Sequence, residues 1–175
     1  MDILPLNHVQ KDFKIFMITM NSQNKNIHQN IDMKYEFFDV TADIGFWAYG
    51  KTLEESFENA ALAMFDVITN LEKVAKKESR NIDVESEDIV SLLYDFLEEL
   101  LIFHELDLIM FSNFEIMIKK EINNEKEIYK LNAIAYGETI NWKIHEKRSE
   151  VKAITFHMME VLCDEICKVR VILDL

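Results

Sequence analysis

The spacing of apolar residues changes along the chain, and this change restricts the fold more than any other feature of the sequence. Within residues 52–70, apolar side chains recur at helical spacing: Leu53, Phe57, Ala60, Met64, Phe65 and Ile68. Residues 88–104 repeat the pattern with Ile89, Leu92, Leu93, Phe96, Leu97 and Leu100. From about Leu106 onward the period falls to two, which is typical of strands. Helical segments combined with alternating strands predict an α+β domain.

The expected elements can be placed approximately from local signals. Thr52 and Glu55 form a capping-box pattern that starts the first helix, and Ser86 is the expected N-cap of the second. Alternation predicts strands at 35–38, 46–49, 108–111, 114–122, 128–138, 151–162 and 168–175. We therefore expect a single domain with a mostly antiparallel sheet of about six to eight strands and two amphipathic helices.

The first part of the chain has a different composition from the rest. The stretch NSQNKNIHQN is polar and lacks apolar periodicity, so residues 1–33 are predicted to be a poorly ordered arm before a domain at 34–175. No apolar run approaches the about 18–20 residues of a membrane span. IFMITM, at 15–20, is shorter than the apolar core of a signal peptide. These features predict a cytoplasmic protein with no membrane partner.

The formal net charge is −13. Proteins that hold nucleic acids depend on clustered Lys and Arg, so we expect no tight direct binding of RNA or DNA. An acidic chain is better suited to contact a basic protein surface or to hold cations. On charge alone, however, the favoured interpretation is that acidity only keeps the protein soluble.

Two cysteines stand four residues apart, Cys163 and Cys167. A zinc site normally needs four ligands, and no second cysteine pair exists. Asp164 and Glu165 look like the turn between two strands. We expect a reduced, half-buried pair beside a hairpin, without a chemical role.

Histidine and nucleotide motifs offer little support for catalysis. His157 alternates with Ala153, Thr155 and Met159, which favours a packing role over a metal ligand or base. There is no HxxxH or HxH pair, and GxGxxG, GxxxxGK[ST] and GxSxG are all missing from the sequence.

Carboxylates are the remaining candidates. Asp43 stands in DVTADIGFWAYG, and the simplest interpretation is an Asx-type turn before Gly45. The final strand ends at Asp174 and Leu175 with no polar tail. If the strand that begins near Tyr35 pairs with the last strand, Asp43 could meet Asp174 and the terminal carboxylate of Leu175. Three converging carboxylates would need a hard cation such as Ca²⁺ or Mg²⁺.

The same residues resemble a known family. YEFFDVTADIGFWAYGKTLEESFENAALAMFDV is similar to the N-terminal signature of the archease family, in which a Tyr-Glu-x-x-Asp-His-Thr-Ala-Asp stretch precedes a Gly-x-[ST]-Leu-Glu-Glu-Ala-Phe helix start. SLLYDFLEELLIFHE, YGETINWKIHE, EVKAITFHMM and VILDL are also similar to archease segments, in the same order. The resemblance covers residues 34–175, and the arm before them matches nothing in the family.

The resemblance implies a function. Archeases are non-catalytic protein cofactors of the RtcB-type tRNA-splicing RNA ligase, which joins a 2′,3′-cyclic phosphate or 3′-phosphate end to a 5′-hydroxyl through a guanylylated histidine. They promote guanylylation and multiple turnover. The implied cation, Ca²⁺, would be bound by Asp43, Asp174 and Leu175, with Gly45 and Gly50 shaping the corner that holds Asp43. We expect a monomer or weak oligomer.

One position departs from the family pattern. Val40 stands where the family usually has histidine before Thr-Ala-Asp, so that histidine's role is lost or supplied elsewhere, for which His157 is the candidate. Two other function classes stay open: a metal-dependent hydrolase that uses the same carboxylates, and a chaperone-like adaptor with apolar grooves. The lack of a base or nucleophile at motif spacing argues against the hydrolase.

Overall fold

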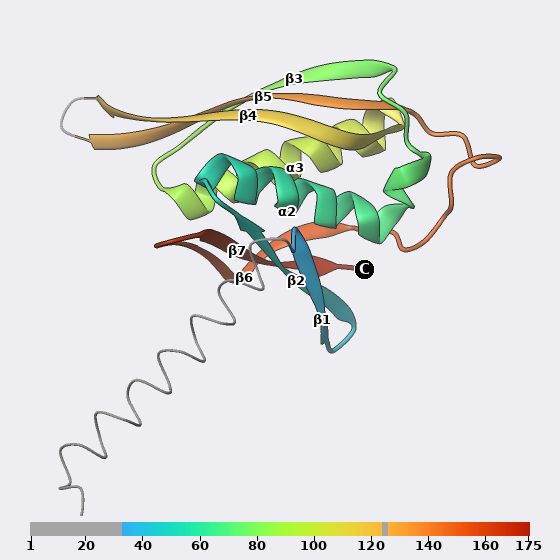
Figure 1. Cartoon of the computed structure of the whole chain (residues 1–175), viewed down its shortest axis with the longest axis horizontal. Coiled ribbons are helices and arrows are strands. Elements are labelled where there is room, and N and C mark those ends of the chain that lie inside the picture. The colour runs from blue at the N-terminus through green and yellow to red at the C-terminus, as the bar shows by residue number, and fades with distance from the viewer. Residues whose placement is uncertain (1–32, 124–125) are drawn as a thin grey trace, which may run out of the picture. The chain divides into compact units, whose positions relative to one another are not determined.

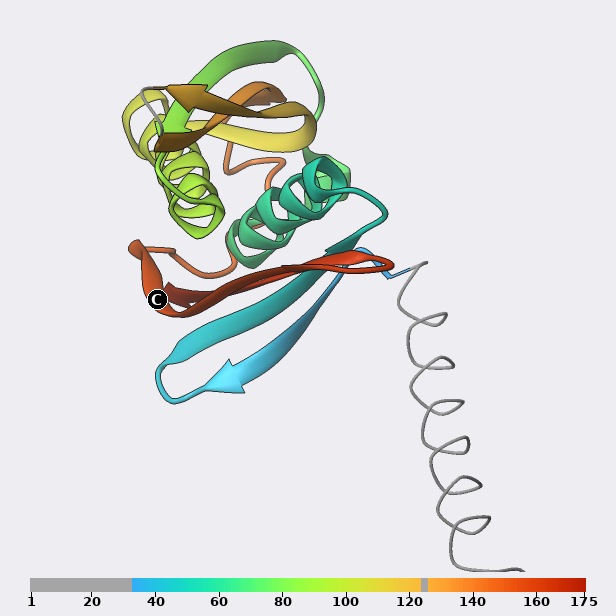
Figure 2. The same ribbon diagram turned by 90° about the vertical axis from the view of Figure 1, so that its left-hand side faces the viewer.

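The computed structural model describes residues 33–123 and 126–175, and the predicted N-terminal arm, residues 1–32, lies outside this part. Two helices lie between two antiparallel sheets, so Lys34–Leu175 is built as a sheet–helix–sheet sandwich (Figure 1). The same three layers are seen from the side in Figure 2. The expected α+β class is confirmed, with the strands divided between two sheets.

The first sheet contains the strands that carry the predicted cation ligands. Its order is β1-β2-β7-β6, with β1 at Tyr35–Val40, β2 at Asp43–Gly50, β6 at Ala153–Cys163 and β7 at Cys167–Asp174. The C-terminal strand β7 is therefore central, paired antiparallel with β2 on one side and β6 on the other. A strand held on both sides keeps the end of the chain in a fixed place.

The second sheet has the order β3-β5-β4, with β3 at Glu78–Ser86, β4 at Ile109–Asn123 and β5 at Lys126–Thr139. Two expected strands, 108–111 and 114–122, are one strand, interrupted only by a register shift between Phe111 and Asn113. β3 was not predicted, because only two of its residues, Ile82 and Val84, are aliphatic among polar neighbours.

Helix α2 spans Leu53–Ile68 and α3 spans Ile89–Asp107. Thr52 caps α2 as predicted and accepts a hydrogen bond from the Glu55 amide. The predicted cap of α3 is wrong: Asp88, not Ser86, accepts from the first free amides, while the Ser86 hydroxyl donates to Asp95. A short 3-10 turn, η1, spans Leu71–Lys73. None of the helices in the described part of the chain is long and apolar enough to span a membrane.

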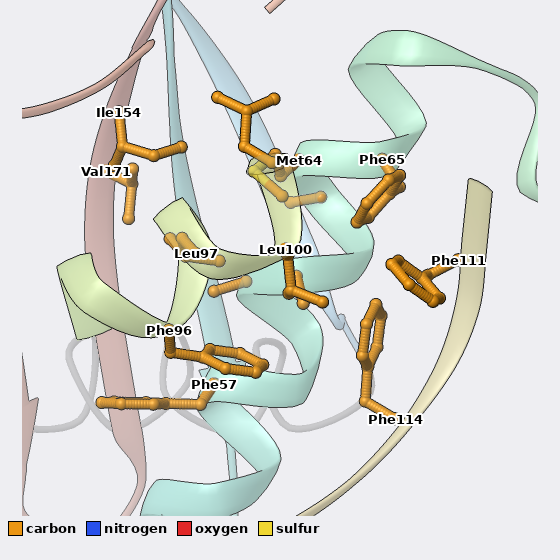
Figure 3. Close-up of a cluster of buried hydrophobic side chains, with 14 of the residues drawn as sticks. Phe57, Met64, Phe65, Phe96, Leu97, Leu100, Phe111, Phe114, Ile154 and Val171 are labelled. Atoms are coloured by element: carbon orange, nitrogen blue, oxygen red, sulfur yellow. The ribbon is translucent and has the colours of Figure 1, made fainter. Parts of the chain in front are cut away.

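The core lies where the helices face both sheets. Figure 3 shows Phe57, Phe65 and Phe96 from the helices together with Phe111 and Phe114 from β4. Phe65 contacts Phe111 edge-on, with ring centroids 5.5 Å apart. On the other side, Ile154 and Val171 complete the same buried cluster from the first sheet. Burial of this aromatic and aliphatic surface is what fixes both sheets on the helices.

The cysteine prediction is wrong in one respect. Cys163 and Cys167 face each other across the β6–β7 hairpin and are joined in a disulfide, instead of being a reduced pair. Asp164 and Glu165 do lie in the turn between the two strands. The disulfide closes the end of the hairpin opposite to Asp174.

Candidate metal centre

The β1–β2 hairpin sets the position of Asp43. β1 and β2 are joined by the two-residue turn Thr41–Ala42, and Val40 pairs with Asp43 directly after it. Ala42 has φ 66°, in the left-handed region that costs an L residue about 1–2 kcal/mol. Asp43 is therefore the first strand residue after a tight turn, which rules out the Asx-turn interpretation.

The two glycines do not form this corner, contrary to the prediction. Gly45 and Gly50 both lie within β2, and neither has a positive φ. Glycine is needed at both positions because neighbouring groups leave no space for a side chain. A Cβ on Gly45 would lie 2.2 Å from the ring of Phe38, and a Cβ on Gly50 would lie 2.3 Å from the amide nitrogen of Ser56, at the start of α2.

Asp43 and Asp174 lie directly opposite each other in neighbouring strands. The β2–β7 register pairs Asp43 with Asp174, then Ile44 with Leu173. Asp43 therefore lies opposite Asp174, as predicted. The strand pairing that brings them together differs from the prediction: β1, which begins at Tyr35, pairs only with β2, and β2 pairs with the last strand. Directly opposed residues project from the same face with Cβ atoms about 4.5–5.5 Å apart.

The electrostatics of this pair are unfavourable without a counter-ion. Asp43 is half-buried and Asp174 is exposed. Within residues 33–123 and 126–175, neither carboxylate takes part in a hydrogen bond or ion pair with another side chain. Like charges directly opposite each other in a sheet destabilise it. A cation bound between them would remove this repulsion.

The chain end supplies the third anionic group. The Leu175 side chain packs against the core, which anchors the last residue beside Asp174. Its terminal carboxylate accepts a hydrogen bond from the ammonium of Lys152 at 2.7 Å, and the Lys152 amide donates to the Asp174 carbonyl at 2.9 Å. The terminus is therefore held by both its side chain and its carboxylate.

The chemical type of these three ligands suits a hard divalent cation. All three groups are carboxylates, the ligands that Ca²⁺ and Mg²⁺ prefer, and two of them have no other partner in the part of the chain that is described. No group of three or more His, Cys, Asp or Glu side chains suited to a metal exists in that part of the chain. A cation site here would need the terminal carboxylate as a third protein ligand.

Comparison with known proteins identifies the family. The model of the Archease protein family (MTH1598/TM1083) matches residues 35–175. The protein archease of Methanothermobacter thermautotrophicus is 54% identical over 142 residues, which cover 81% of this chain and 98% of that protein. This chain belongs to the archease family.

Other archeases and a solved structure agree with this. The protein archease of Pyrococcus abyssi is 52% identical over 128 residues, which cover 73% of this chain and 87% of that protein. The solution structure of Methanobacterium thermoautotrophicum protein 1598 superposes with a TM-score of 0.67 at 52% identity, covering 81% of this chain and 99% of that one. The fold found here is therefore that of a solved relative.

Val40, at the position where the sequence resemblance implies a histidine, lies beside the candidate centre. Val40 is the cross-strand partner of Asp43, so an apolar side chain stands where the family histidine would be. The predicted packing role of His157 is wrong. The β6–β7 register shifts between Thr155 and Glu160, and His157 lies exposed in the resulting bulge. The bulge breaks the alternation on which the prediction depended.

The archease-like block YGETINWKIHE contains a buried polar network that sequence reasoning did not find. The Glu138 side chain is 7% exposed and accepts from the Lys77 ammonium at 2.5 Å and from the Ala75 amide at 2.7 Å. His145 Nδ1 accepts from the Asn141 amide, so Nε2 carries the proton and donates to Glu138 at 3.2 Å. Lys77 first, then the Ala75 amide, lowers the pKa of Glu138 to about 2.

This network holds the segment that links the two sheets. Residues 140–152 run from the end of β5 to the start of β6, past the C-terminal end of α2 (Figure 1). There the amides of Arg148 and Ser149 donate to the carbonyls of Ile68 and Val67, which are free at the helix end. The segment ends at Val151, which is buried, and Lys152, which contacts the chain terminus.

Proposed function

We propose that this archease-family protein is a non-catalytic activator of an RtcB-type RNA ligase, which promotes ligase guanylylation and multiple turnover in tRNA splicing or RNA repair. The observation that carries the proposal is the opposed pair Asp43–Asp174 at the held end of β7 in a chain of this family. A divalent cation, Ca²⁺ in our proposal, is bound by Asp43, Asp174 and the Leu175 carboxylate.

The protein's own residues define what the site can do. β2 presents Asp43 and β7 presents Asp174 on one face, and the packing of Leu175 anchors the residue that follows Asp174. When bound, the cation supplies positive charge that neutralises the carboxylates and a fixed electrostatic centre for a partner group. The backbone on either side is part of the sheet ladder, so the site is presented rigidly to a partner protein.

The charge of the chain supports a protein partner over a nucleic acid. At −13, the protein lacks the basic character needed to hold phosphates by itself. A ligase must be basic where it holds RNA, so an acidic activator can dock close to that surface without competing for the RNA.

The hydrolase alternative lacks the groups it would need. Opposite Asp43 stands Val40, which can neither accept a proton nor bind a metal. His157 lies in an exposed bulge of β6, a strand that is not adjacent to β2. A chaperone-like adaptor remains the other alternative, and fold alone does not distinguish it from an activator.

RNA ligation by the cognate ligase is the direct test. The substrate carries a 2′,3′-cyclic phosphate and a 5′-hydroxyl, and this protein is added at substoichiometric amounts. We expect multiple turnover and faster guanylylation with the protein, and single-turnover behaviour without it. An equally acidic, unrelated protein controls for non-specific charge effects. Unchanged ligase turnover would refute the proposed role.

Assays of the purified protein without the ligase distinguish the activator from the hydrolase and the chaperone-like adaptor. We expect no ligase, nuclease or nucleotidyl-transferase activity, and only weak RNA binding at physiological salt. Hydrolytic turnover that depends on Asp43 would favour the hydrolase. Suppressed aggregation of unrelated unfolded proteins would favour the adaptor. Tight, salt-sensitive RNA binding would contradict both the charge argument and the activator role.

A further inference from the structure

Lys152 makes two contacts at the end of the chain. Its amide donates to the Asp174 carbonyl at 2.9 Å, continuing the β6–β7 ladder by one residue beyond Ala153, which pairs with Asp174. Its ammonium donates to the carboxylate of Leu175 at 2.7 Å. Backbone and side chain of the same residue thus hold the last two residues of the protein.

The position of Lys152 is determined by its neighbours. Val151, directly before it, is 3% exposed, which fixes the backbone at this point. Ala153, directly after it, is in register with Asp174 on β7, and Asp174 is in register with Asp43 on β2. Lys152 therefore directly precedes the edge strand β6, beside Asp174 and on the side of β7 away from Asp43, and its ammonium contacts Leu175 at the chain end.

The charges of this group determine which cation it suits. Asp43, Asp174 and the Leu175 carboxylate carry three negative charges, and Lys152 supplies one positive charge. The remaining two negative charges match one divalent ion. Without the lysine the same carboxylates would carry three uncompensated charges, which suits a trivalent ion better. Ligand charge and rigidity together set the affinity of such oxygen sites.

We infer that Lys152 is a positioning and specificity-determining residue of the cation site: it holds the terminal carboxylate at the end of β7, next to Asp174, and sets the charge of the site for a divalent ion. The inference rests on the cation site of the proposed function. It assigns to Lys152 a role that is separate from ligation, because it concerns which ion the protein selects.

The test compares binding of Ca²⁺ and La³⁺ to the purified full-length protein by calorimetry. The variants are Lys152→Met, which keeps most of the stem but removes the charge, and Lys152→Arg, which keeps the charge. Lys119→Met is the matched control, because it changes the net charge equally but lies in β4 of the other sheet. The ratio of the two affinities is the readout, since a general loosening of the terminus weakens binding of both ions.

We expect Lys152→Met to raise the preference for La³⁺ over Ca²⁺. A unit charge about 4 Å away contributes about 1 kcal/mol per unit of ion charge even in water, so the ratio should rise about fivefold or more. Lys152→Arg and Lys119→Met should keep the wild-type ratio. The Lys152→Met protein should also melt at a lower temperature than the Lys119→Met protein when no cation is added.

An unchanged ratio in Lys152→Met would overturn the inference, and so would an equal change in Lys119→Met. Failure of the wild-type protein to bind either ion would overturn it as well. None of these measurements involves the ligase, so ligase activation by the same preparations still decides the proposed function independently.

Discussion

Two groups of carboxylates in this protein differ in their hydrogen-bond partners. Glu138 is enclosed by donors: an ammonium from Lys77, a backbone amide from Ala75 and a ring nitrogen from His145. Asp43 and Asp174 lie opposite each other without a side-chain partner among the described residues. Both arrangements lie at strand ends, Glu138 near the end of β5 and the aspartates at the start of β2 and the end of β7.

The difference indicates different roles. A buried carboxylate with a complete set of donors stabilises the fold, and removing it leaves those donors unsatisfied. Two opposed carboxylates without donors cost stability in the isolated protein, and such an arrangement is of use only when something positive binds to it. We therefore assign Glu138 to structure and Asp43 with Asp174 to function.

The largest effect is expected at the aspartates, and it concerns activity. Asp43→Ala and Asp174→Ala should each reduce ligase activation to the background of the ligase alone, because two remaining carboxylates are too few for a hard cation that prefers about six to eight oxygen ligands. The melting temperature without cation should stay the same or rise, since repulsion is relieved. Ligation kinetics and thermal melting of the same preparations measure both effects.

Asp39→Ala is the matched control for these variants. Asp39 is an exposed residue of β1 that pairs with Ile44, so it lies on the opposite face of the hairpin from Val40 and Asp43. It should activate the ligase like the wild type. If the Asp43→Ala protein activates the ligase normally, or if it fails to fold, the assignment of Asp43 to function and of Glu138 to structure is contradicted.

The next largest effect is expected at Glu138, and it concerns stability. Glu138→Gln removes the charge that Lys77, Ala75 and His145 contact, and should lower the free energy of unfolding by about 2 kcal/mol. Glu127→Gln is the control: its ion pair with Lys120 is exposed on both sides and should contribute less than about 1 kcal/mol. Urea unfolding of both variants measures the difference. Equal small losses would show that the buried network is no more important than a surface pair.

The smallest effect is the pH dependence of that same difference. The pKa of Glu138 in the folded protein is about 2, below its ordinary value of 4.5. Its contribution to stability is therefore fully present above about pH 4.5 and is lost as the pH falls toward 2. The stability difference between wild type and Glu138→Gln should narrow over this range. A difference that is constant from pH 6 to about pH 3 would contradict the assigned role.

Much of the fold could be predicted from apolar spacing. Both helices follow from their periodicity, and Thr52 with Glu55 marks the start of α2 because this cap is purely local. The class was predictable because period-two segments fill the second half of the chain. The start of α3 was misplaced because Ser86 and Asp88 are both good caps, and the choice depends on Ser86 donating to Asp95 on the helix.

Pairing and long-range contacts were less predictable. That β2, not β1, lies beside β7 depends on which strands bury their faces against α2 and α3, and a single sequence does not show this. The need for Gly45 comes from the ring of Phe38 on the neighbouring strand. The Glu138–His145 pair joins the end of β5 to the irregular segment that follows, where apolar periodicity gives no information.

The proposed ligands of the candidate site could be predicted from the sequence, but the lysine beside them could not. Asp43, Asp174 and Leu175 could be proposed from the sequence because the last strand ends without a tail, and the register brings Asp43 opposite Asp174. Lys152 was not found, because a lysine before a strand is common and only the folded chain brings its ammonium to Leu175.

A C-terminal extension tests the central claim most directly, because the claim requires the chain to end at Leu175 as a free carboxylate. Adding two glycines converts this carboxylate to a peptide carbonyl, carries the chain past the Asp43–Asp174 pair and leaves every side chain unchanged. Measured as multiple-turnover ligation by the cognate ligase, activation by the extended protein should fall to the level of Asp174→Ala, while its melting temperature shows a folded domain. An extended protein that activates the ligase as well as the wild type would contradict the three-carboxylate site.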